Sequence, residues 1–253
     1  MNIIVNLYKH LPTTIKRKTN RLYKYLPRSK KIVIKKIDGI TYQLDLSRLS
    51  HAQIYHYGCW EKYTTEIIKK NVKEGMTVLD IGASSGVHTL RLAKLVGKKG
   101  KVYAFEPSSW MIKRLLKNIE LNNFLNVIVT KVALSNTNEK GKIMGTTHGR
   151  LGIKNPTSED IEEDIDFIKV DVDGYECKIV KGGLKTLKKF KPLMVIELSK
   201  KYQEKFGESV EELIGLLKSV GYSFYKEQTL EKYTEEELDK ETTEGVINVL
   251  CKA

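Results

Sequence analysis

Hydrophobic and polar positions along this chain follow two periods, one of two residues and one of about 3.6 residues. Short apolar runs rich in β-branched residues predict strands, and the amphipathic stretches between them predict helices. Strands are expected at 77–81, 101–105, 126–132, 166–171, 193–198, 223–226 and 246–251, and helices at 86–96, 108–121, 175–189 and 208–220. Because strands that alternate with helices form parallel sheets covered on both faces, the pattern predicts an α/β fold.

The two ends of this pattern differ from its middle. Residues 31–36 and 41–45 flank Asp38-Gly39, a dipeptide typical of hairpin turns, and a helical pattern follows over 50–71. Near the C-terminus only the acidic stretch Glu231–Glu244 separates the last two strands, and it predicts no strong helix. We therefore expect these two strands to pair antiparallel at the sheet edge. Residues 37–253 contain no internal repeat and no low-complexity linker, which favours one domain.

Residues 1–36 have a composition of their own. They contain eleven Lys and Arg residues and no acid, in a chain whose formal net charge is +13. Apolar residues fall at helical spacing before Pro12 and again before Pro27. Such a basic amphipathic N-terminal arm fits an anionic membrane surface or, with less support, the phosphate backbone of RNA. The third interpretation is that its apolar faces pack on the following domain and its charges are solvated.

Cysteine usage and hydropathy limit the cellular compartments in which we expect the protein. Cys59, Cys177 and Cys251 are odd in number and form no C-x-x-C pair, which argues against a disulfide framework and a thiolate zinc site. No apolar run approaches the roughly 18–20 residues that span a bilayer. The first apolar residues precede the basic ones, the reverse of a secretory signal. We expect a cytoplasmic protein, with the arm as a means of peripheral membrane binding.

The turn after the strand at 77–81 carries the strongest signal of a ligand site. Gly82-Ala83-Ser84-Ser85-Gly86 would let a ligand approach the backbone and the N–H groups of the next helix. The turn lacks the G-x-G-x-x-G spacing of dinucleotide sites and the Gly-Lys-Ser/Thr of phosphate loops. Asp80 would repel a pyrophosphate but suits an ammonium group, and Glu106 is placed to accept hydrogen bonds from both hydroxyls of a ribose. An amine and a ribose without a phosphate describe S-adenosylmethionine.

These residues resemble a known family. The segments Asp80–Gly86, Phe105-Glu106-Pro107 and Val132–Ser135 look like a class I S-adenosylmethionine-dependent methyltransferase. The run I-D-F-I-K-V-D-V-D-G-Y-E over 165–176, followed by Val195-Ile196-Glu197, resembles the FkbM family. The resemblance covers roughly residues 58–199 and implies a Rossmann-like sheet of seven strands, mostly parallel, with an antiparallel edge strand. The chain departs from the usual pattern at Ser84-Ser85, at Asp173 where Glu is usual, and at Leu198-Ser199 where a His often follows the Glu.

The resemblance also implies an activity and a set of cofactor contacts. Members of the FkbM family transfer methyl groups to hydroxyls of sugars and other natural products. It implies that S-adenosylmethionine is bound by Asp80, Gly82, Ala83, Gly86, Glu106, Ala133 and Leu134, with the methionine part near the first four, the ribose on Glu106 and the adenine beside the last two.

Carboxylates gather where the fourth and fifth parallel strands end. Asp171, Asp173 and Glu176 follow the fourth strand, and Glu197 ends the fifth. Crowded carboxylates either raise one another's pKa, which makes a general base, or gather a divalent cation. Asp173 and Glu176 also occupy the N-cap and N3 positions of the predicted helix, where capping is the alternative role. Asp171 and Glu197 are our catalytic candidates, no residue is assigned to a metal, and a divalent cation stays an open alternative. His148, in a polar loop, is a further candidate base.

Together these features predict an S-adenosylmethionine-dependent O-methyltransferase. The acceptor we expect is a hydroxyl of a sugar in a glycan or glycolipid, with residues 1–36 at an anionic surface. One alternative is an RNA methyltransferase that binds RNA with this arm. The other is a binding protein that keeps the cofactor fold without turnover.

Overall fold

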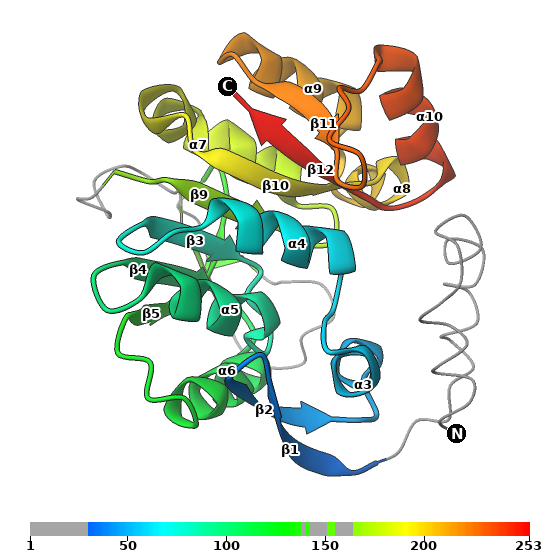
Figure 1. The fold of residues 1–253 in the computed structure, drawn as a ribbon. Helices are drawn as coiled ribbons and strands as arrows, with labels where there is room; N and C mark the ends of the chain where they lie inside the picture. Colours follow the sequence, from blue (N-terminus) through cyan, green and yellow to red (C-terminus); the bar gives the residue numbers. More distant parts are fainter. Residues whose placement is uncertain (1–29, 138–139, 142–150, 155–163) are drawn as a thin grey trace. The chain divides into compact units, whose positions relative to one another are not determined.

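A seven-stranded sheet crosses the C-terminal part of the chain that the structure describes (Figure 1). The computed structural model describes residues 30–137, 140–141, 151–154 and 164–253. From β10 to β5 neighbouring strands pair in parallel, whereas β12 is antiparallel to both of its neighbours, β10 and β11. The strand order is β11 (Ser223–Lys226), β12 (Ile247–Lys252), β10 (Leu193–Leu198), β9 (Phe167–Val170), β3 (Thr77–Ile81), β4 (Lys101–Phe105) and β5 (Val127–Thr130). The predicted mostly parallel α/β sheet with antiparallel pairing at one edge is confirmed.

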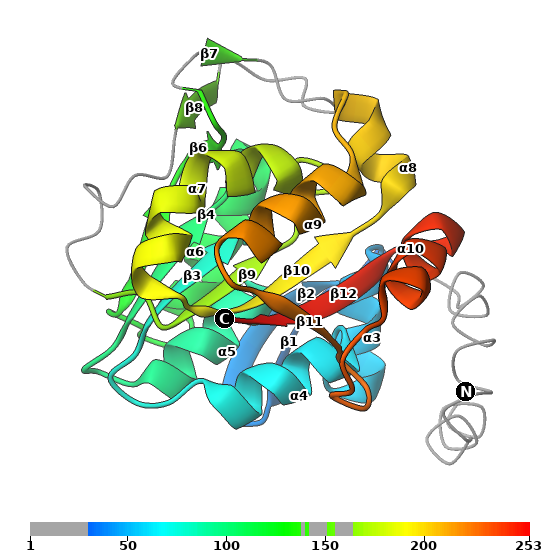
Figure 2. The same cartoon turned by 90° about the horizontal axis from the view of Figure 1, so that it is seen from above.

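Helices cover both faces of this sheet (Figures 1 and 2). One face carries α4 (Lys62–Asn71), α5 (Val87–Val96) and α6 (Ser109–Glu120), and the other carries α7 (Glu176–Phe190), α9 (Val210–Ser219) and α10 (Glu235–Glu244). Successive side chains of a strand point to opposite faces, so each strand supplies both layers. Val78, Phe167 and Val195 belong to the core under α4 and α5, and Leu79 and Ile168 belong to the core under α7 and α9.

The chain between β5 and β9 departs from the predicted pattern. The strand expected at 126–132 ends at Thr130, and a separate strand β6 (Val132–Leu134) follows it. β6 pairs with β8 (Leu151–Lys154), which also pairs with β7 (Lys140–Gly141) in a three-stranded sheet. Apolar continuity through this stretch hid the break, since Val129 and Val132 read as one strand although Lys131 lies outside both.

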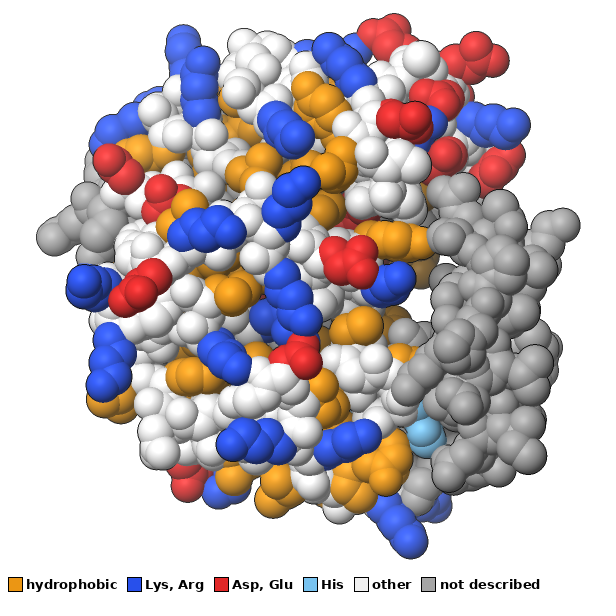
Figure 3. All heavy atoms as spheres, viewed as in Figure 1, with side chains coloured by type: hydrophobic (Ala, Val, Ile, Leu, Met, Phe, Trp, Pro, Cys, Tyr) orange, Lys and Arg blue, Asp and Glu red, His pale blue; other side chains and the backbone are white. Residues whose placement is uncertain are grey.

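The acidic stretch before β12 is a helix, which corrects the expectation that it held no strong one. α10 begins after Thr234, whose side chain accepts from the backbone N–H of Glu237, and Glu237 in turn accepts from the backbone N–H of Thr234. This capping box and three glutamates in the first turn stabilise the helix N-terminus. Weak amphipathicity hid a helix whose start is fixed by its cap. On the face drawn in Figure 3, acidic side chains gather over α10.

The N-terminal part that the structure describes contains a hairpin and a helix. β1 (Ile32–Ile37) and β2 (Ile40–Asp45) pair antiparallel, and the turn residues Asp38 and Gly39 have φ of 51° and 73°. These values are those of the turn that an Asp-Gly pair favours, and they confirm the predicted hairpin. The helix α3 (Leu49–Tyr57) ends at Gly58, so the predicted helical region 50–71 contains two helices, α3 and α4.

Residue contacts divide the chain into two compact units, Met1–Thr65 and Glu66–Ala253. β1 starts at Ile32, so residues 32–36 of the compositional arm lie in a paired strand. The division into an arm over 1–36 and a domain over 37–253 therefore stays a prediction about charge and composition. No helix among the described residues is long and apolar enough to cross a membrane.

Candidate functional site

Polar side chains replace apolar ones at the carboxyl end of one sheet face. On the face under α5, Val78 is followed by Asp80 along β3, Phe167 by Lys169 along β9, and Val195 by Glu197 along β10. The register pairs Asp80 with Lys169 and Lys169 with Val195, so these side chains share one row. Asp171 and Glu197 begin the next row, directly after the paired residues Val170 and Ile196. The opposite face stays apolar to its end, and the chemistry therefore concentrates on one side of one edge.

The glycine turn after β3 packs against the end of β9. Gly82 has φ of 85°, and a Cβ atom there would lie 1.9 Å from the backbone oxygen of Asp171. Gly86 has φ of 91°, and a Cβ there would lie 2.6 Å from Leu115 of α6. Gly82 requires glycine for conformation and for space, because the close atom is backbone, whereas at Gly86 the positive φ is the requirement, since the close atom is the end of the Leu115 side chain. Ala83 is buried beside Leu115 and Ala104. The turn is thereby held close to Asp171, with the first residues of α5 beyond it.

Asp80 carries an acceptor atom that the described residues leave unsatisfied. Its Oδ2 accepts a hydrogen bond from Thr89 Oγ1 of α5 at 2.6 Å, and its side chain is buried. Its Oδ1 is fully buried and has no hydrogen-bond partner in the described part of the chain. Because a buried unpaired acceptor is costly, this atom suits a ligand that carries an N–H donor.

Glu106 joins the glycine turn to the start of α6. Its Oε2 accepts from the backbone N–H of Ser84 at 2.9 Å, and its Oε1 accepts from the backbone N–H of Ser108 at 2.7 Å. A carboxylate group can accept several hydrogen bonds, so Glu106 suits a ligand that carries hydroxyl groups. The buried acceptor of Asp80, the glycine turn and this carboxylate together fit the amine and the ribose of S-adenosylmethionine.

The turn between β9 and α7 brings three carboxylates to the same edge. Asp171 Oδ2 lies 3.0 Å from Lys169 Nζ, and the two side chains are 26% and 4% exposed. Asp173 has φ of 55° and is exposed. Partial burial and the Asp171 charge raise the pKa of Asp173, and Lys205 and Lys169 oppose that rise.

Glu176 lies behind this turn and closes it. It is 1% exposed, and its Oε1 accepts from the backbone N–H groups of Val172 at 2.9 Å and Gly174 at 3.3 Å. Burial raises the pKa of Glu176 to about 7, against these backbone hydrogen bonds, with a smaller contribution from Asp171. The capping-box alternative is wrong, because Tyr175 is the N-cap of α7 and Glu176 is its first residue.

The remaining predicted site residues lie in different settings. Ala133 and Leu134 belong to β6, where Ala133 is half-buried and Leu134 is 2% exposed in the core under α7. Glu197 is half-buried on β10, opposite Asn248 of β12. His148 lies outside the described residues. Their roles in cofactor binding or catalysis stay predictions.

Three groups that form hydrogen bonds in this site were not predicted from the sequence. Lys169, Thr89 and the backbone N–H of Ser84 contact Asp171, Asp80 and Glu106 respectively. A signal for Lys169 was present, since Phe167, Lys169 and Asp171 alternate with the apolar Ile168 and Val170. A two-residue period places a lysine and an aspartate on one face. Nothing in the sequence marked the other two contacts, because they join segments that meet only in the folded chain.

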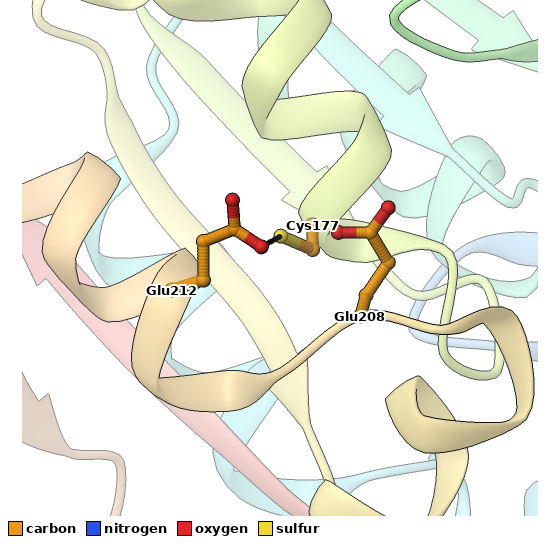
Figure 4. A group of neighbouring side chains, drawn as sticks. All are labelled: Cys177, Glu208 and Glu212. Carbon is orange, nitrogen blue, oxygen red and sulfur yellow. Dashed lines mark hydrogen bonds between the residues drawn. The ribbon is translucent and has the colours of Figure 1, made fainter.

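A second polar cluster lies between α7 and α9 (Figure 4). Cys177, Glu208 and Glu212 offer ligand atoms within 4.8 Å of one another. Lys181 Nζ already lies 2.5 Å from Glu208 Oε2 and 3.0 Å from Glu212 Oε2, so an ammonium group neutralises both carboxylates. The Cys177 thiol donates to Glu212 Oε2 at 3.9 Å, and burial raises the pKa of the thiol to about 12, with neighbouring Glu208 adding to the rise. A neutral thiol beside two carboxylates that already form ion pairs with Lys181 is a poor metal site.

A groove beside the edge strand β11 is separate from the site at the carboxyl ends of the parallel strands. It has a volume of about 790 Å³ and lies between α9, β11 and α10. Ion pairs link its walls, from Lys218 to Glu235 and from Lys200 to Glu211 and Asp239. β11 is the edge strand furthest from β5, so the groove is several strands away from the glycine turn.

A family model described as the methyltransferase FkbM domain matches residues 80–224, which is more than half of the chain. The match begins at Asp80 and includes the glycine turn, Glu106, the Lys169–Asp171 pair and β10. The chain belongs to the FkbM methyltransferase family. This is a family of S-adenosylmethionine-dependent methyltransferases, as the sequence predicted, and the buried acceptor and the glycine turn of the site fit that cofactor.

Other comparisons agree on the fold of this FkbM-family chain. A solved FkbM methyltransferase from Methylobacillus flagellatus is 15% identical with a TM-score of 0.50, over 82% of this chain and 54% of that one. A Clostridium thermocellum protein described as a candidate rRNA methylase is 16% identical with a TM-score of 0.50, over 76% of this chain and 93% of that one. At such identities the likeness shows the fold alone.

A second family model, for protein-L-isoaspartate O-methyltransferases, matches residues 24–133. A curated member from Methanococcoides burtonii is 38% identical over 58 residues, which are 23% of this chain and 29% of that protein. The chain thus matches less than a third of the length of that relative. The model ends before β9, so it does not include the Lys169–Asp171 pair.

Proposed function

We propose that this FkbM-family enzyme transfers a methyl group to a hydroxyl oxygen, with Asp171 as the general base. The observation that carries the proposal is the Asp171 carboxylate, partly exposed at the carboxyl edge and anchored by Lys169 beside the glycine turn. A neutral alcohol is a poor nucleophile, so its methylation benefits from a base worth roughly 10²–10⁴-fold in rate. Glu197 begins the same row and is proposed as the second catalytic carboxylate.

S-adenosylmethionine supplies a methyl group on a positively charged sulfur. Asp171 accepts the hydroxyl proton of the acceptor as the oxygen–carbon bond forms and the sulfur–carbon bond breaks. The glycine turn and Asp80 hold the donor, so that alignment of the two reactants lowers the barrier.

Other acceptor chemistries have less support among the described residues. Cysteine catalysis needs a reactive thiolate, but Cys177 and Cys251 are buried and burial raises the pKa of both thiols. The residues that follow β9 are Asp-Val-Asp-Gly over 171–174, whereas enzymes that methylate amines carry an Asn/Asp-Pro-Pro-aromatic motif at that place. A charged carboxylate next to the methyl donor is better suited to removing a hydroxyl proton.

The acceptor we propose is a sugar hydroxyl of a glycan or glycolipid. The FkbM resemblance supports it, and residues 1–36 are proposed to bring the enzyme to an anionic surface that carries such an acceptor. RNA is the second candidate, because the same basic residues would bind phosphate. The match to isoaspartate methyltransferases covers the cofactor half of the chain, so it adds no support for a carboxyl acceptor.

Methyl transfer into a cell extract tests this proposal. Extract is incubated with radiolabelled S-adenosylmethionine and the full-length enzyme, then separated into lipid, glycan, RNA and protein. We expect label in the glycan or lipid fraction with wild type and little with Asp171→Asn, whereas the exposed-site control Asp164→Asn should label as wild type does. Label in RNA would replace the proposed acceptor, and label from Asp171→Asn at the wild-type rate would remove Asp171 as base.

A further inference from the structure

Lys169 is a buried cation within the acidic edge of the sheet. Its side chain is 4% exposed, and the register places it between Asp80 of β3 and Val195 of β10. A buried ammonium group needs a fixed counter-charge, because burial removes its hydration. That counter-charge is Asp171, whose Oδ2 lies 3.0 Å away. The pair holds the first carboxylate beyond the sheet in a defined orientation.

The same pair leaves part of Asp171 accessible. The salt bridge uses Oδ2, and the Asp171 side chain is 26% exposed while Lys169 is not. Lys169 therefore contacts Asp171 from the interior, and the carboxylate can receive a proton from the outer side. As an ammonium ion Lys169 has no lone pair, so it cannot itself accept the proton of the acceptor hydroxyl.

We propose that Lys169 is the positioning residue of this site and takes the place of a divalent cation among its carboxylates. The ammonium group orients Asp171 toward the acceptor hydroxyl and balances the negative charge of the edge. The inference rests on the O-methyl transfer proposed above, in which the hydroxyl proton passes to Asp171 while the methyl group moves from sulfur to oxygen.

The charges around Asp171 support this assignment. A divalent ion binds carboxylate oxygens at about 2.0–2.6 Å, and on Asp171 it would lie within a few ångströms of the Lys169 ammonium. Like charges at that distance repel strongly in a partly buried site. Of the neighbouring acids, Glu176 already accepts two backbone N–H groups through one oxygen, and Asp173 faces Lys205 as well as Lys169. Lys169 and Lys205 thus supply positive charge to the acids of this turn.

Binding of Mn²⁺ alone, followed by the loss of its free signal in electron paramagnetic resonance, tests the proposal on the full-length protein. Wild type and Asp171→Asn should bind Mn²⁺ equally weakly. Lys169→Met should bind it roughly tenfold more tightly or better, because a repelling charge is gone. Adding Asp171→Asn to Lys169→Met should abolish that gain, and Lys169→Arg should keep the wild-type behaviour. Lys117→Met, which removes a surface lysine from its pair with Glu120, is the matched control and should change nothing.

Two results would overturn the proposal. One is a Mn²⁺ site in wild type that Asp171→Asn removes, and the other is a folded Lys169→Met that gains no site. Circular dichroism and binding of S-adenosylhomocysteine report whether Lys169→Met folds, and if it does not, the comparison of wild type with Asp171→Asn decides alone. These measurements need no methyl acceptor, so a failed methyl-transfer assay would count against the proposed function and leave this result standing.

Discussion

Glu106 shows how one side chain serves both structure and ligand at the residue scale. Sequence reasoning placed it under a ribose, and the structure adds that it binds the backbone N–H groups of Ser84 and Ser108. Its loss would therefore remove two acceptors for the ligand and loosen the turn that surrounds the ligand. Both effects act in the same direction on cofactor affinity.

Glu106→Ala should weaken binding of S-adenosylhomocysteine, measured by isothermal titration calorimetry. Hydrogen bonds to a charged acceptor contribute about 1.5–3 kcal/mol each, so we expect a loss of tenfold or more in affinity. The control Glu120→Ala, which removes an exposed glutamate from α6, should bind as wild type does. Equal affinities for wild type and Glu106→Ala would show that the ribose lies elsewhere.

Asp171 and Glu197 begin the same row of the sheet, which predicts that they act together. Asp171→Asn and Glu197→Gln should each lower turnover by roughly 10²-fold or more with near-normal cofactor affinity. The double variant should be little slower than either single one, because residues that act as a unit are not additive. The rate of label transfer into the accepting fraction measures this. Additive losses would separate the two roles, and turnover within a factor of two in Asp171→Asn would make His148 the leading candidate base.

Glu176 makes stability depend on pH. Its pKa of about 7 lies above the ordinary value of 4.5, so the folded state holds a proton that the unfolded state releases between these values. Its contribution to stability is present below about pH 4.5 and is lost as pH rises through about 7. The full change is on the order of 3 kcal/mol.

Glu176→Gln keeps an oxygen that accepts from Val172 and Gly174 but does not titrate. The free energy of unfolding in urea, measured from pH 5 to 8, should fall with pH more steeply for wild type than for this variant. Glu176→Ala should lose stability at every pH, because two turn N–H groups lose their acceptor, at about 1–3 kcal/mol each. Parallel pH profiles for wild type and Glu176→Gln would contradict the raised pKa.

At the scale of elements, the ends of helices and strands decide more than their middles. α10 exists in a stretch whose amphipathic pattern is weak, because Thr234 and Glu237 satisfy each other's backbone N–H groups at its start. The helix then buries Leu238 in the core to which Phe224 of β11 and Val249 of β12 also belong. A local cap therefore determines the start of a helix that contributes to this core.

Thr234→Ala should destabilise the protein by about 0.5–2 kcal/mol, the usual cost of losing an N-cap side chain. Chemical denaturation measures this loss. Thr243→Ala, in the exposed last turn of the same helix, removes a hydroxyl that bonds only to the carbonyl of Asp239, and it should cost nothing. If the two variants were equally stable, the capping box would not contribute to the start of α10.

At the scale of the whole molecule, charge is divided along the chain. Eleven basic residues lie in the first 36. The same segment includes most of β1, which exposes two apolar side chains, Ile32 at 60% and Ile34 at 61%. Ile32 and Ile34 share the exposed face of β1 with Lys36, and Lys31 precedes the strand, which fits insertion of apolar groups between anionic headgroups. Acidic side chains gather at the opposite end of the sequence, on α10.

Deletion of residues 1–30 should reduce sedimentation with anionic phosphatidylserine vesicles and leave S-adenosylhomocysteine binding unchanged. Basic residues near such a surface contribute about 1 kcal/mol each, so the loss should be large at low salt and smaller at high salt. Neutral phosphatidylcholine vesicles are the control and should bind neither form. Unchanged binding to anionic vesicles would retire the membrane hypothesis, and lost cofactor binding would make the segment part of the fold.

Patterns in the sequence were enough to predict the α/β fold, the glycine turn and the carboxylates proposed for the site. Each of these features depends on residues that are close together in the sequence. The periods of two and about 3.6 residues predict the strands and helices, and Gly82 and Gly86 occupy positions of positive φ. Asp80, Glu106 and Asp171 lie at or directly after the ends of strands. The contacts that these groups make could be found only in the folded chain. Thr89 of α5 donates to Asp80 of β3, the backbone N–H of Ser84 donates to Glu106 across 22 residues, and β12 lies between β10 and β11. Local patterns fix dihedral angles and burial, whereas pairings between distant segments depend on register and packing that no single segment contains.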